Sequence, residues 1–434
     1  MITLMKLAGI YHPDQVTDTT VSREALKCIA NAIFLNEEAK AYLEQEKGLY
    51  ALQSLLQSKQ LSLETQFLTC RILFFMTVNR HDLVQQLIDA DIASSIEKVL
   101  SDNVSSLEDP DKRNKLDKNT VINPWTVTSE ALKLLFNLLL VESRQSDTPD
   151  ATDTFRQCLV PVFHLLFAVP YPEPQPLAPP HSQGIHALMQ FPFETIAVVW
   201  RAQKEWTKTL YNTVEEGAEF VVNILVNVLD RAIHVLIPNG DPDHTDHEQQ
   251  ADAAIAPVLL VLATLAEGSP YVQKSLSARM LPSTEDRIRP VHEGNSLPAY
   301  LIRFMTSTMM PQSRNAVCET LFILCNKDAN MFTQQVGYGN AIGFLVNKGI
   351  PMDPPQDHDE LHDINPITGQ FTSSEKQGPD LKDMTDEEKE REAEKLFVLF
   401  ERLKKTGIID VENPIAKAMQ EGKLEEIKSD SDSE

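Results

Sequence analysis

Two clusters of histidine and acidic side chains could bind a metal ion, and one of them lies between Ile237 and Gln250. Its members are Asp241, Asp243, His244, Asp246, His247 and Glu248, and the second cluster spans Asp357 to Asp363 with His358 and His362. Neither has the glycine and terminal glutamate of an EF-hand loop, and neither contains the H-E-x-x-H motif of zinc proteases. We therefore interpret both clusters as solvated loops and expect no metal site.

A glycine-rich run, GYGNAIG from Gly337 to Gly343, is similar to a dinucleotide-binding loop. Its third glycine comes one place late, however, and a helical pattern rather than a strand precedes it, so we interpret the run as a tight turn between helices. The sequence also lacks G-x-x-x-x-G-K-[ST], G-x-S-x-G and a Cys/His nucleophile arrangement. We therefore expect no cofactor, and no enzyme that makes or breaks covalent bonds.

Helices must position whatever site this chain has, because apolar residues recur at three- and four-residue spacing and alternating runs are hard to find. The pattern predicts an all-α fold. The predicted helices are Ser22 to Leu35, Leu63 to Val78, Val127 to Val141, Glu215 to Ile237, Ala251 to Glu267, Leu297 to Met309 and Arg314 to Asn326.

A short phrase recurs in these helices, with an acidic residue seven positions before a polar or basic one. The copies are Glu24 to Asn31, Glu130 to Asn137, Glu216 to Asn223 and Glu319 to Asn326, with a weaker copy from Glu64 to Arg71. Seven positions are two helical turns, so both ends share one face. The starts at 24 and 64 are 40 residues apart, and those at 130 and 216 are 86 apart, which is two units of 43.

Units of about 40 to 47 residues are typical of armadillo and HEAT arrays. We therefore predict an armadillo/HEAT-like right-handed superhelical solenoid over residues 1–350, although coincidence among leucine-rich helices remains an alternative. In such arrays the last helix of each unit lines a groove. The candidate ligand contacts in that groove are Asn31, Arg71, Asn137, Asn223, Asn227 and Asn326. Alternatively, each of these side chains caps or bridges neighbouring helices.

The charge balance excludes some partners. Lysine and arginine total 39 against 63 acidic residues, a formal charge of −24, which repels nucleic acid and anionic lipid. Five scattered cysteines are consistent with reduced thiols in the cytoplasm. Apolar runs such as Ala131 to Val141 are too short to span a bilayer, so we expect no direct membrane insertion.

Three segments interrupt or follow the array. Residues 169–180 are rich in proline and should form an extended break, more plausibly a spacer than an adaptor ligand. Residues 351–384 should be an acidic polar linker. From Thr385 a capping box begins an amphipathic helical arm, with Leu396, Phe397 and Phe400 on or beside its apolar face. The arm either caps the array or reaches a partner, and Ser429 and Ser431 in the acidic tail suit acidophilic kinases.

The chain resembles the synembryn family. The resemblance is carried by Arg23 to Asn31, Glu130 to Leu138, Arg303-Phe-Met-Thr306, Glu319 to Cys325, Gly337-Tyr-Gly-Asn-Ala341, Asn365-Pro-Ile-Thr-Gly369 and the arm from Thr385 through Pro414. It implies a monomeric guanine-nucleotide exchange factor and folding chaperone for heterotrimeric G-protein α subunits (Gα). Such a protein binds GDP-loaded or nucleotide-free Gα in the cytoplasm, and Gα can recruit it to the plasma membrane.

In that family the Gα carboxyl-terminal helix docks in the groove, and the arm is a second contact. The resemblance adds Arg303 to the candidate contacts. An armadillo-type peptide-binding adaptor is the alternative, but the tryptophan that nuclear import receptors place four residues before the groove asparagine is missing, since those positions hold Lys27, Lys133, Glu219 and Phe322. We expect charge reversal at Arg71, or replacement of Asn137, to lower Gα affinity without unfolding the array.

Overall fold

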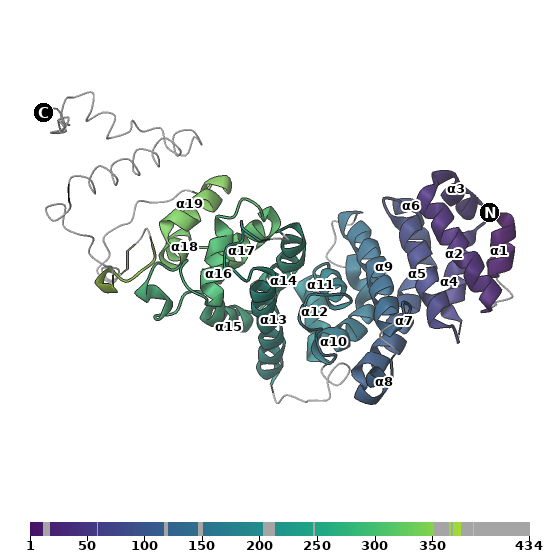
Figure 1. Ribbon diagram of the computed structural model, residues 1–434, viewed down its shortest axis with the longest axis horizontal. Coiled ribbons are helices and arrows are strands. Elements are labelled where there is room, and N and C mark those ends of the chain that lie inside the picture. The colour runs from purple at the N-terminus through teal and green to yellow at the C-terminus, as the bar shows by residue number, and fades with distance from the viewer. Residues whose placement is uncertain are drawn as a thin grey trace, which may run out of the picture. The chain divides into compact units, whose positions relative to one another are not determined.

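The structure is a computed structural model that describes residues 1–11, 18–58, 60–116, 120–145, 151–202, 213–245, 248–350, 364–365, 368–374 and 385 (Figure 1). Helices make up nearly all of the regular structure in these ranges, and an isolated antiparallel bridge joins Ile364 and Phe371. The predicted all-α fold is therefore confirmed. Contacts divide the chain into Met1–Ser374 and Glu375–Glu434, and of the second unit only Thr385 is described.

Each of the seven predicted helices is present, with ends shifted by a few residues. The α-helices are α1 (Ile2–Ala8), α2 (Thr20–Leu35), α3 (Glu37–Gln45), α4 (Gly48–Gln57), α5 (Leu63–Thr77), α6 (His81–Asp89), α7 (Ile92–Glu108), α8 (Pro110–Asn114), α9 (Pro124–Gln145), α10 (Leu159–Phe167), α11 (His181–Leu188), α12 (Phe193–Arg201), α13 (Val214–Leu236), α14 (Glu248–Gly268), α15 (Pro270–Met280), α16 (Leu297–Met305), α17 (Pro311–Leu324), α18 (Ala329–Val336) and α19 (Tyr338–Asn347). Short 3-10 helices are η1 (Ala151–Cys158), η3 (Asp286–Ile288) and η4 (Thr372–Ser374).

Helices from successive units lie side by side and run parallel, as a repeat array requires. α2 packs on α5 and α5 packs on α9 (Figure 1). Along α5 and α9, Arg71 bonds Glu130 at 2.7 Å, and six residues further along α5 Thr77 bonds Asn137 at 2.9 Å. Because both contacts advance in the same direction, the two helices are parallel.

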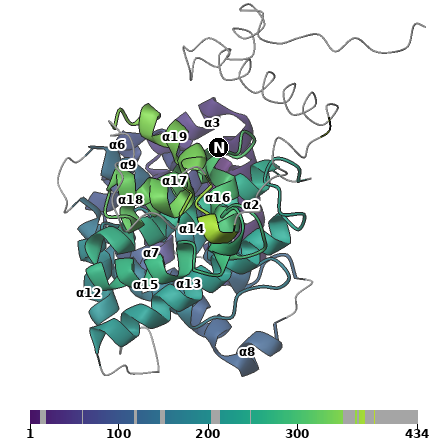
Figure 2. The ribbon, with the colours of Figure 1, turned by 90° about the vertical axis from the view of Figure 1, so that its left-hand side faces the viewer.

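The same alignment recurs between α14 and α17. The Asp252 carboxylate of α14 accepts a hydrogen bond from the Ser313 amide of α17 at 2.6 Å. Two turns further along both helices, the Thr320 hydroxyl donates to the Leu259 carbonyl at 3.2 Å. α14 and α17 lie side by side in both views (Figure 1 and Figure 2). Parallel stacking in two parts of the chain supports the armadillo-like organisation.

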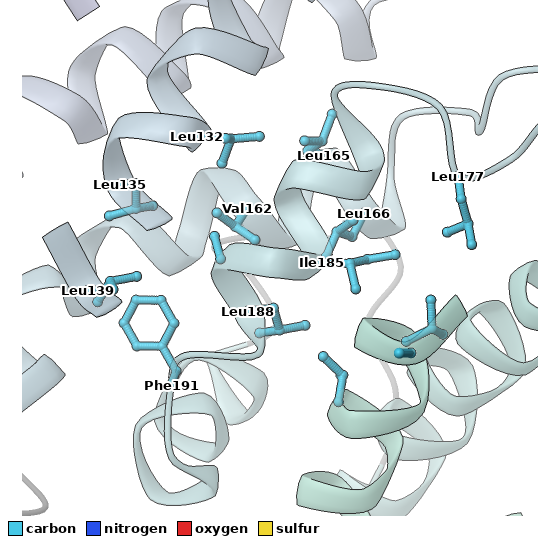
Figure 3. Packing of buried hydrophobic residues seen from close by; sticks show 14 of the residues in the cluster. Leu132, Leu135, Leu139, Val162, Leu165, Leu166, Leu177, Ile185, Leu188 and Phe191 are labelled. Carbon is cyan, nitrogen blue, oxygen red and sulfur yellow. The ribbon is translucent and has the colours of Figure 1, made fainter. Parts of the chain in front are cut away.

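A continuous apolar core runs between the helices. In Figure 3, Leu132 and Leu135 of α9, Val162 of α10 and Ile185 of α11 point into the space that the three helices share. Leu177, from the proline-rich segment 169–180, is buried in the same cluster. α10 and α11 contact each other directly, so the array continues across the proline-rich segment.

α14 is the one described helix that is long and apolar enough to cross a membrane, over Gln249–Gly268, and the sequence analysis did not single it out. Two-thirds of this stretch is buried, and the helix packs against α11, α13, α15 and α17. It also carries Asp252, which caps α17, and Pro257. α14 is therefore a core helix of the array.

The phrase from Glu216 to Asn223 does not occupy the row that repetition predicts. It lies on α13, which packs on α12, α14 and α15, whereas the helix aligned with α17 is α14. The copies on α2, α5 and α9 are stacked in one row. The copy on α13 therefore lies outside this row.

α16 ends at Met305, four residues before the predicted Met309, because the Asp243 carboxylate binds the backbone amides of the residues that follow. Asp243 accepts hydrogen bonds from the amides of Thr308 at 3.0 Å and Met309 at 3.2 Å, and also from the Ser307 hydroxyl. Burial alone would raise the pKa of Asp243, but these hydrogen bonds hold it below its usual value. One of the candidate metal ligands thus has a structural role.

Gly268 allows α12 to approach the end of α14. A methyl group at this position would lie 1.9 Å from Cγ of Phe193. We expect Gly268→Ala to lower the free energy of unfolding by about 2 kcal/mol, in the range typical of overpacking. Gly343→Ala is the matched control, because a methyl group in the middle of α19 meets nothing within 4 Å. Urea titration followed by circular dichroism measures both, and equal midpoints would contradict the prediction.

His181 is buried and neutral. Its ring packs against that of Tyr171, tilted by 37° with the centroids 4.3 Å apart, and burial lowers its pKa from 6.5 to about 4. As the pH falls below 6.5, His181 becomes protonated in the unfolded chain but stays neutral in the folded chain. The free energy of unfolding therefore falls between pH 6.5 and 4, by up to about 3 kcal/mol. We expect His181→Phe to reduce this loss, measured as urea midpoints at pH 7.5 and 5.0. The same pH dependence in the variant would exclude His181 as its source.

Candidate partner-binding surface

Exposed and half-buried side chains on the first three stacked helices form one surface, which we call the α2–α5–α9 strip. The strip consists of Asn31, Phe34, Arg71, Phe75, Lys133 and Asn137. Each helix contributes a polar or basic residue and, on α2 and α5, an aromatic residue one turn later. The strip brings together three of the predicted contacts, Asn31, Arg71 and Asn137.

The basic part of the strip is built around a buried carboxylate. Glu130 is only 4% exposed, and its Oε1 accepts hydrogen bonds from Arg71 at 2.7 Å and from Lys133 at 2.6 Å. The Arg71 guanidinium also lies 4.3 Å from the ring centroid of Phe67. Two cations share one anion, so this part of the strip has a local excess of positive charge in an acidic protein.

The apolar part of the strip lies at the carboxyl ends of α2 and α5. Phe34 is 68% exposed, and its ring centroid is 5.2 Å from that of Phe75. Leu35, 80% exposed, and Val78, 38% exposed, are further apolar residues at the ends of the same two helices. These residues were not among the contacts predicted from the sequence. The sequence feature that could have predicted them is a phenylalanine about one turn after each of Asn31 and Arg71.

The repeated polar positions differ in their surroundings. Asn137 donates to Thr77, and Asn326 follows α17 with a φ of 56° and accepts from Gln273 at 3.2 Å. These two asparagines bridge neighbouring helices, as the alternative interpretation holds. Asn31 and Asn227 are exposed, and neither side chain has a hydrogen-bond partner among the described residues. Asn223, on α13, is half-buried.

Arg303 is held by its own loop. Its Nη1 donates to the carbonyls of His292 at 2.7 Å and Gly294 at 2.8 Å, and its guanidinium lies 4.3 Å from the ring centroid of Tyr300. Burial lowers the pKa of Arg303. These contacts give Arg303 a structural role in fixing the loop before α16.

The remaining predicted sites lie outside the described residues. They are Leu396, Phe397 and Phe400 of the arm and Ser429 and Ser431 of the tail. The histidine cluster at 357–363 also lies outside, as do Asp246 and His247. In the part of the chain that the structure describes, no three His, Cys, Asp or Glu side chains are grouped so that they could hold a metal ion.

A segment of the predicted linker packs back on the array. Arg287, which is 5% exposed, donates to the carbonyl of Gly369 at 2.7 Å and to Gln335 Oε1 at 2.6 Å, while the Phe371 amide donates to the Arg287 carbonyl at 2.9 Å. Gly369 and Phe371 are thereby fixed beside η3, with Gln335 of α18 on the same arginine. Sequence reasoning had not linked Arg287 to this segment.

Comparison with known proteins identifies the family. Residues 1–423 match the family model described as guanine nucleotide exchange factor synembryn. The chain is similar to chaperone Ric-8A of Gallus gallus (26% identity, covering 94% of this chain and 77% of the relative) and of Rattus norvegicus (27% identity, covering 91% and 73%).

Among solved structures, a designed armadillo repeat protein matches with a TM-score of 0.40 and 14% identity, covering 73% of this chain and 99% of that one. The family model spans nearly the whole chain and describes an exchange factor, so this protein is not an enzyme with covalent chemistry. The chain belongs to the synembryn family of guanine nucleotide exchange factors.

Proposed function

We propose that this protein is an exchange factor and folding chaperone for Gα subunits, and that it binds the carboxyl-terminal helix of Gα on the α2–α5–α9 strip. The family and the relatives named as chaperones support the first part. The single observation that carries the second part is the exposed ring of Phe34, which packs on the half-buried ring of Phe75 one turn after Arg71. Exposed aromatic residues next to an arginine are typical of the residues that dominate binding energy at protein interfaces.

Exchange on this surface needs no covalent step. A helix that leaves the Gα core exposes apolar side chains to water, and the apolar part of the strip covers them again. Removing that helix loosens the loops that hold the guanine base, so GDP leaves. The strip accelerates exchange only if it binds nucleotide-free Gα more tightly than GDP-bound Gα, because differential affinity alone shifts the equilibrium.

The charges of the strip contribute to orientation. Arg71 and Lys133 present cations around a single buried carboxylate, so the docked segment should be acidic or end in a carboxylate. The apolar part lies about one helical turn further along α2 and α5. A terminal helix with apolar residues on one face and a negative group near them fits both parts.

The other expectations follow from this role. The protein acts as a cytoplasmic monomer and is recruited to the plasma membrane only through Gα. The arm, with Leu396, Phe397 and Phe400, is a second Gα contact, and Asn223, Asn227 and Arg303 are lesser candidates. Modification of Ser429 or Ser431 would regulate the protein; unchanged exchange activity after phosphatase treatment would reject this last point.

GDP release from purified Gα measures the proposed activity directly. We expect fluorescent GDP to leave at least one Gα class faster when this protein is added, and a stable complex to form when GTP is absent. Excess GTP should dissociate this complex and return the exchange factor for further rounds of GDP release. Unchanged release rates for all Gα classes, together with no complex on gel filtration, would overturn the proposal.

A further inference from the structure

A short stretch beyond the last described α-helix, residues 368–374, is bound to the array at successive positions, and we call it the clasp. The Val291 amide donates to the Thr368 carbonyl at 3.3 Å, and the Gln370 side chain donates to the Ile288 carbonyl at 3.0 Å. Gln370 is 7% exposed, so its amide group is enclosed by these contacts. Contacts also place the clasp in the same unit of the chain as the helices of the array.

Arg287 is the residue on which the other contacts of the clasp converge. Its guanidinium donates to the Gly369 carbonyl at 2.7 Å, and its own carbonyl accepts from the Phe371 amide at 2.9 Å. The same guanidinium donates to the Gln334 carbonyl at 3.2 Å and to Gln335 Oε1 at 2.6 Å. Because Arg287 is only 5% exposed, protein groups supply its hydrogen-bond acceptors. Arg287 therefore joins the clasp both to its own loop and to α18.

A glycine in the clasp lets its backbone approach the array closely. Gly369 has a φ of 70°, and a methyl group there would lie 3.0 Å from both methyl carbons of Val291 and 3.4 Å from the Gly337 amide nitrogen. Gly337 opens the glycine-rich run before α19, so that run forms part of the surface that receives the clasp. Gly349 has a similar φ of 65°, but a methyl group there would meet nothing within 4 Å. Close packing as well as hydrogen bonding therefore holds the clasp at this place.

We propose that the clasp fixes the point from which the arm starts, with Arg287 as its positioning residue, and thereby raises the effective concentration of the arm at a bound Gα. This inference rests on the proposed role of the arm as a second Gα contact. Only 10 residues, 375–384, separate the clasp from Thr385, where the predicted arm begins. Without the clasp, 34 residues, 351–384, would separate the arm from the array. Effective concentration falls roughly as the −3/2 power of tether length, so loss of the clasp should weaken Gα binding about sixfold.

Arg287→Met and Gly369→Ala test the clasp in the full chain. Each should raise hydrogen–deuterium exchange in residues 368–374, measured by mass spectrometry, and weaken the binding of nucleotide-free Gα about sixfold. Gly349→Ala is the matched control, because it imposes the same kind of backbone strain without a clash, and it should change neither measurement. Gly369→Ala alters the clasp and not the helices, so it decides the test if Arg287→Met does not fold.

A second background separates positioning of the arm from a purely structural role. In a chain that carries Leu396→Asp and Phe400→Asp on the predicted apolar face of the arm, Gly369→Ala should weaken Gα binding no further, because the clasp acts only through the arm. An equal loss of affinity on both backgrounds would overturn the proposal, as would wild-type affinity in a chain whose clasp exchanges freely. Wild-type affinity in the arm variant alone would instead refute the arm contact of the proposed function, and the role of the clasp with it.

Discussion

Phe34→Asp is expected to weaken Gα binding about 30-fold, corresponding to a loss of about 2 kcal/mol at a dominant interface residue. Phe34 is 68% exposed and its ring rests on Phe75, so a partner that covers the pair removes both rings from water. Aspartate at this position keeps the site hydrated and repels an acidic partner segment. Titration of labelled nucleotide-free Gα measures the dissociation constant.

The control is Val346→Asp, because Val346 is 64% exposed and lies on α19, away from the strip. Both substitutions add one negative charge at an exposed apolar position, so the change in net charge is equal. Only Phe34→Asp should weaken binding. If both variants bind Gα like the wild type, the apolar part of the strip is not the docking surface.

Arg71→Glu is expected to lower the free energy of unfolding by about 2 kcal/mol, since it removes one of the two cations that pair with the buried Glu130 carboxylate and puts a like charge in its place. The new carboxylate would face Glu130, which is 4% exposed and retains only Lys133. From the sequence we expected charge reversal at Arg71 to leave the array folded. The pairing of Arg71 with the buried Glu130 instead predicts a loss of stability. Chemical denaturation of the purified variant measures the loss.

Arg71→Met is the substitution that separates stability from binding. Methionine keeps an apolar stem against Phe67, and Lys133 still pairs with Glu130. We expect this variant to remain folded and to bind Gα several-fold more weakly. Wild-type stability in Arg71→Glu would show that Glu130 does not depend on Arg71, and wild-type affinity in Arg71→Met would remove Arg71 from the binding surface.

The helices could be predicted because their apolar periodicity is a local property of the sequence. The strip could be predicted in part, since Asn31, Arg71 and Asn137 share a phase within the repeated phrase and lie on three stacked helices. The sequence does not show which aromatic residues of these helices are exposed. Phe34 and Phe67 look alike in the sequence, but Phe67 is buried and Phe34 is exposed.

The remaining features depend on contacts between residues far apart in the chain. Asp243 ends α16 early through contacts with residues 64 to 66 positions later, and no local rule places it there. Arg287 meets Gly369 across 82 residues. The 216–223 phrase matches the other copies in sequence but lies on α13, outside the row of α2, α5 and α9. A matching phrase therefore does not by itself assign a helix to a row.

The parallel alignment of α5 with α9 has a consequence for how this chain tolerates changes in length. Two side-chain pairs join these helices, Arg71 with Glu130 and Thr77 with Asn137, and the paired residues are 59 and 60 positions apart in the sequence. This separation is longer than one repeat period because α7 and the polar segment after it lie between the two helices in the chain. Register is therefore set by side-chain pairs and not by loop length. Residues inserted into or deleted from this connector should therefore leave the pairing of α5 with α9 unchanged.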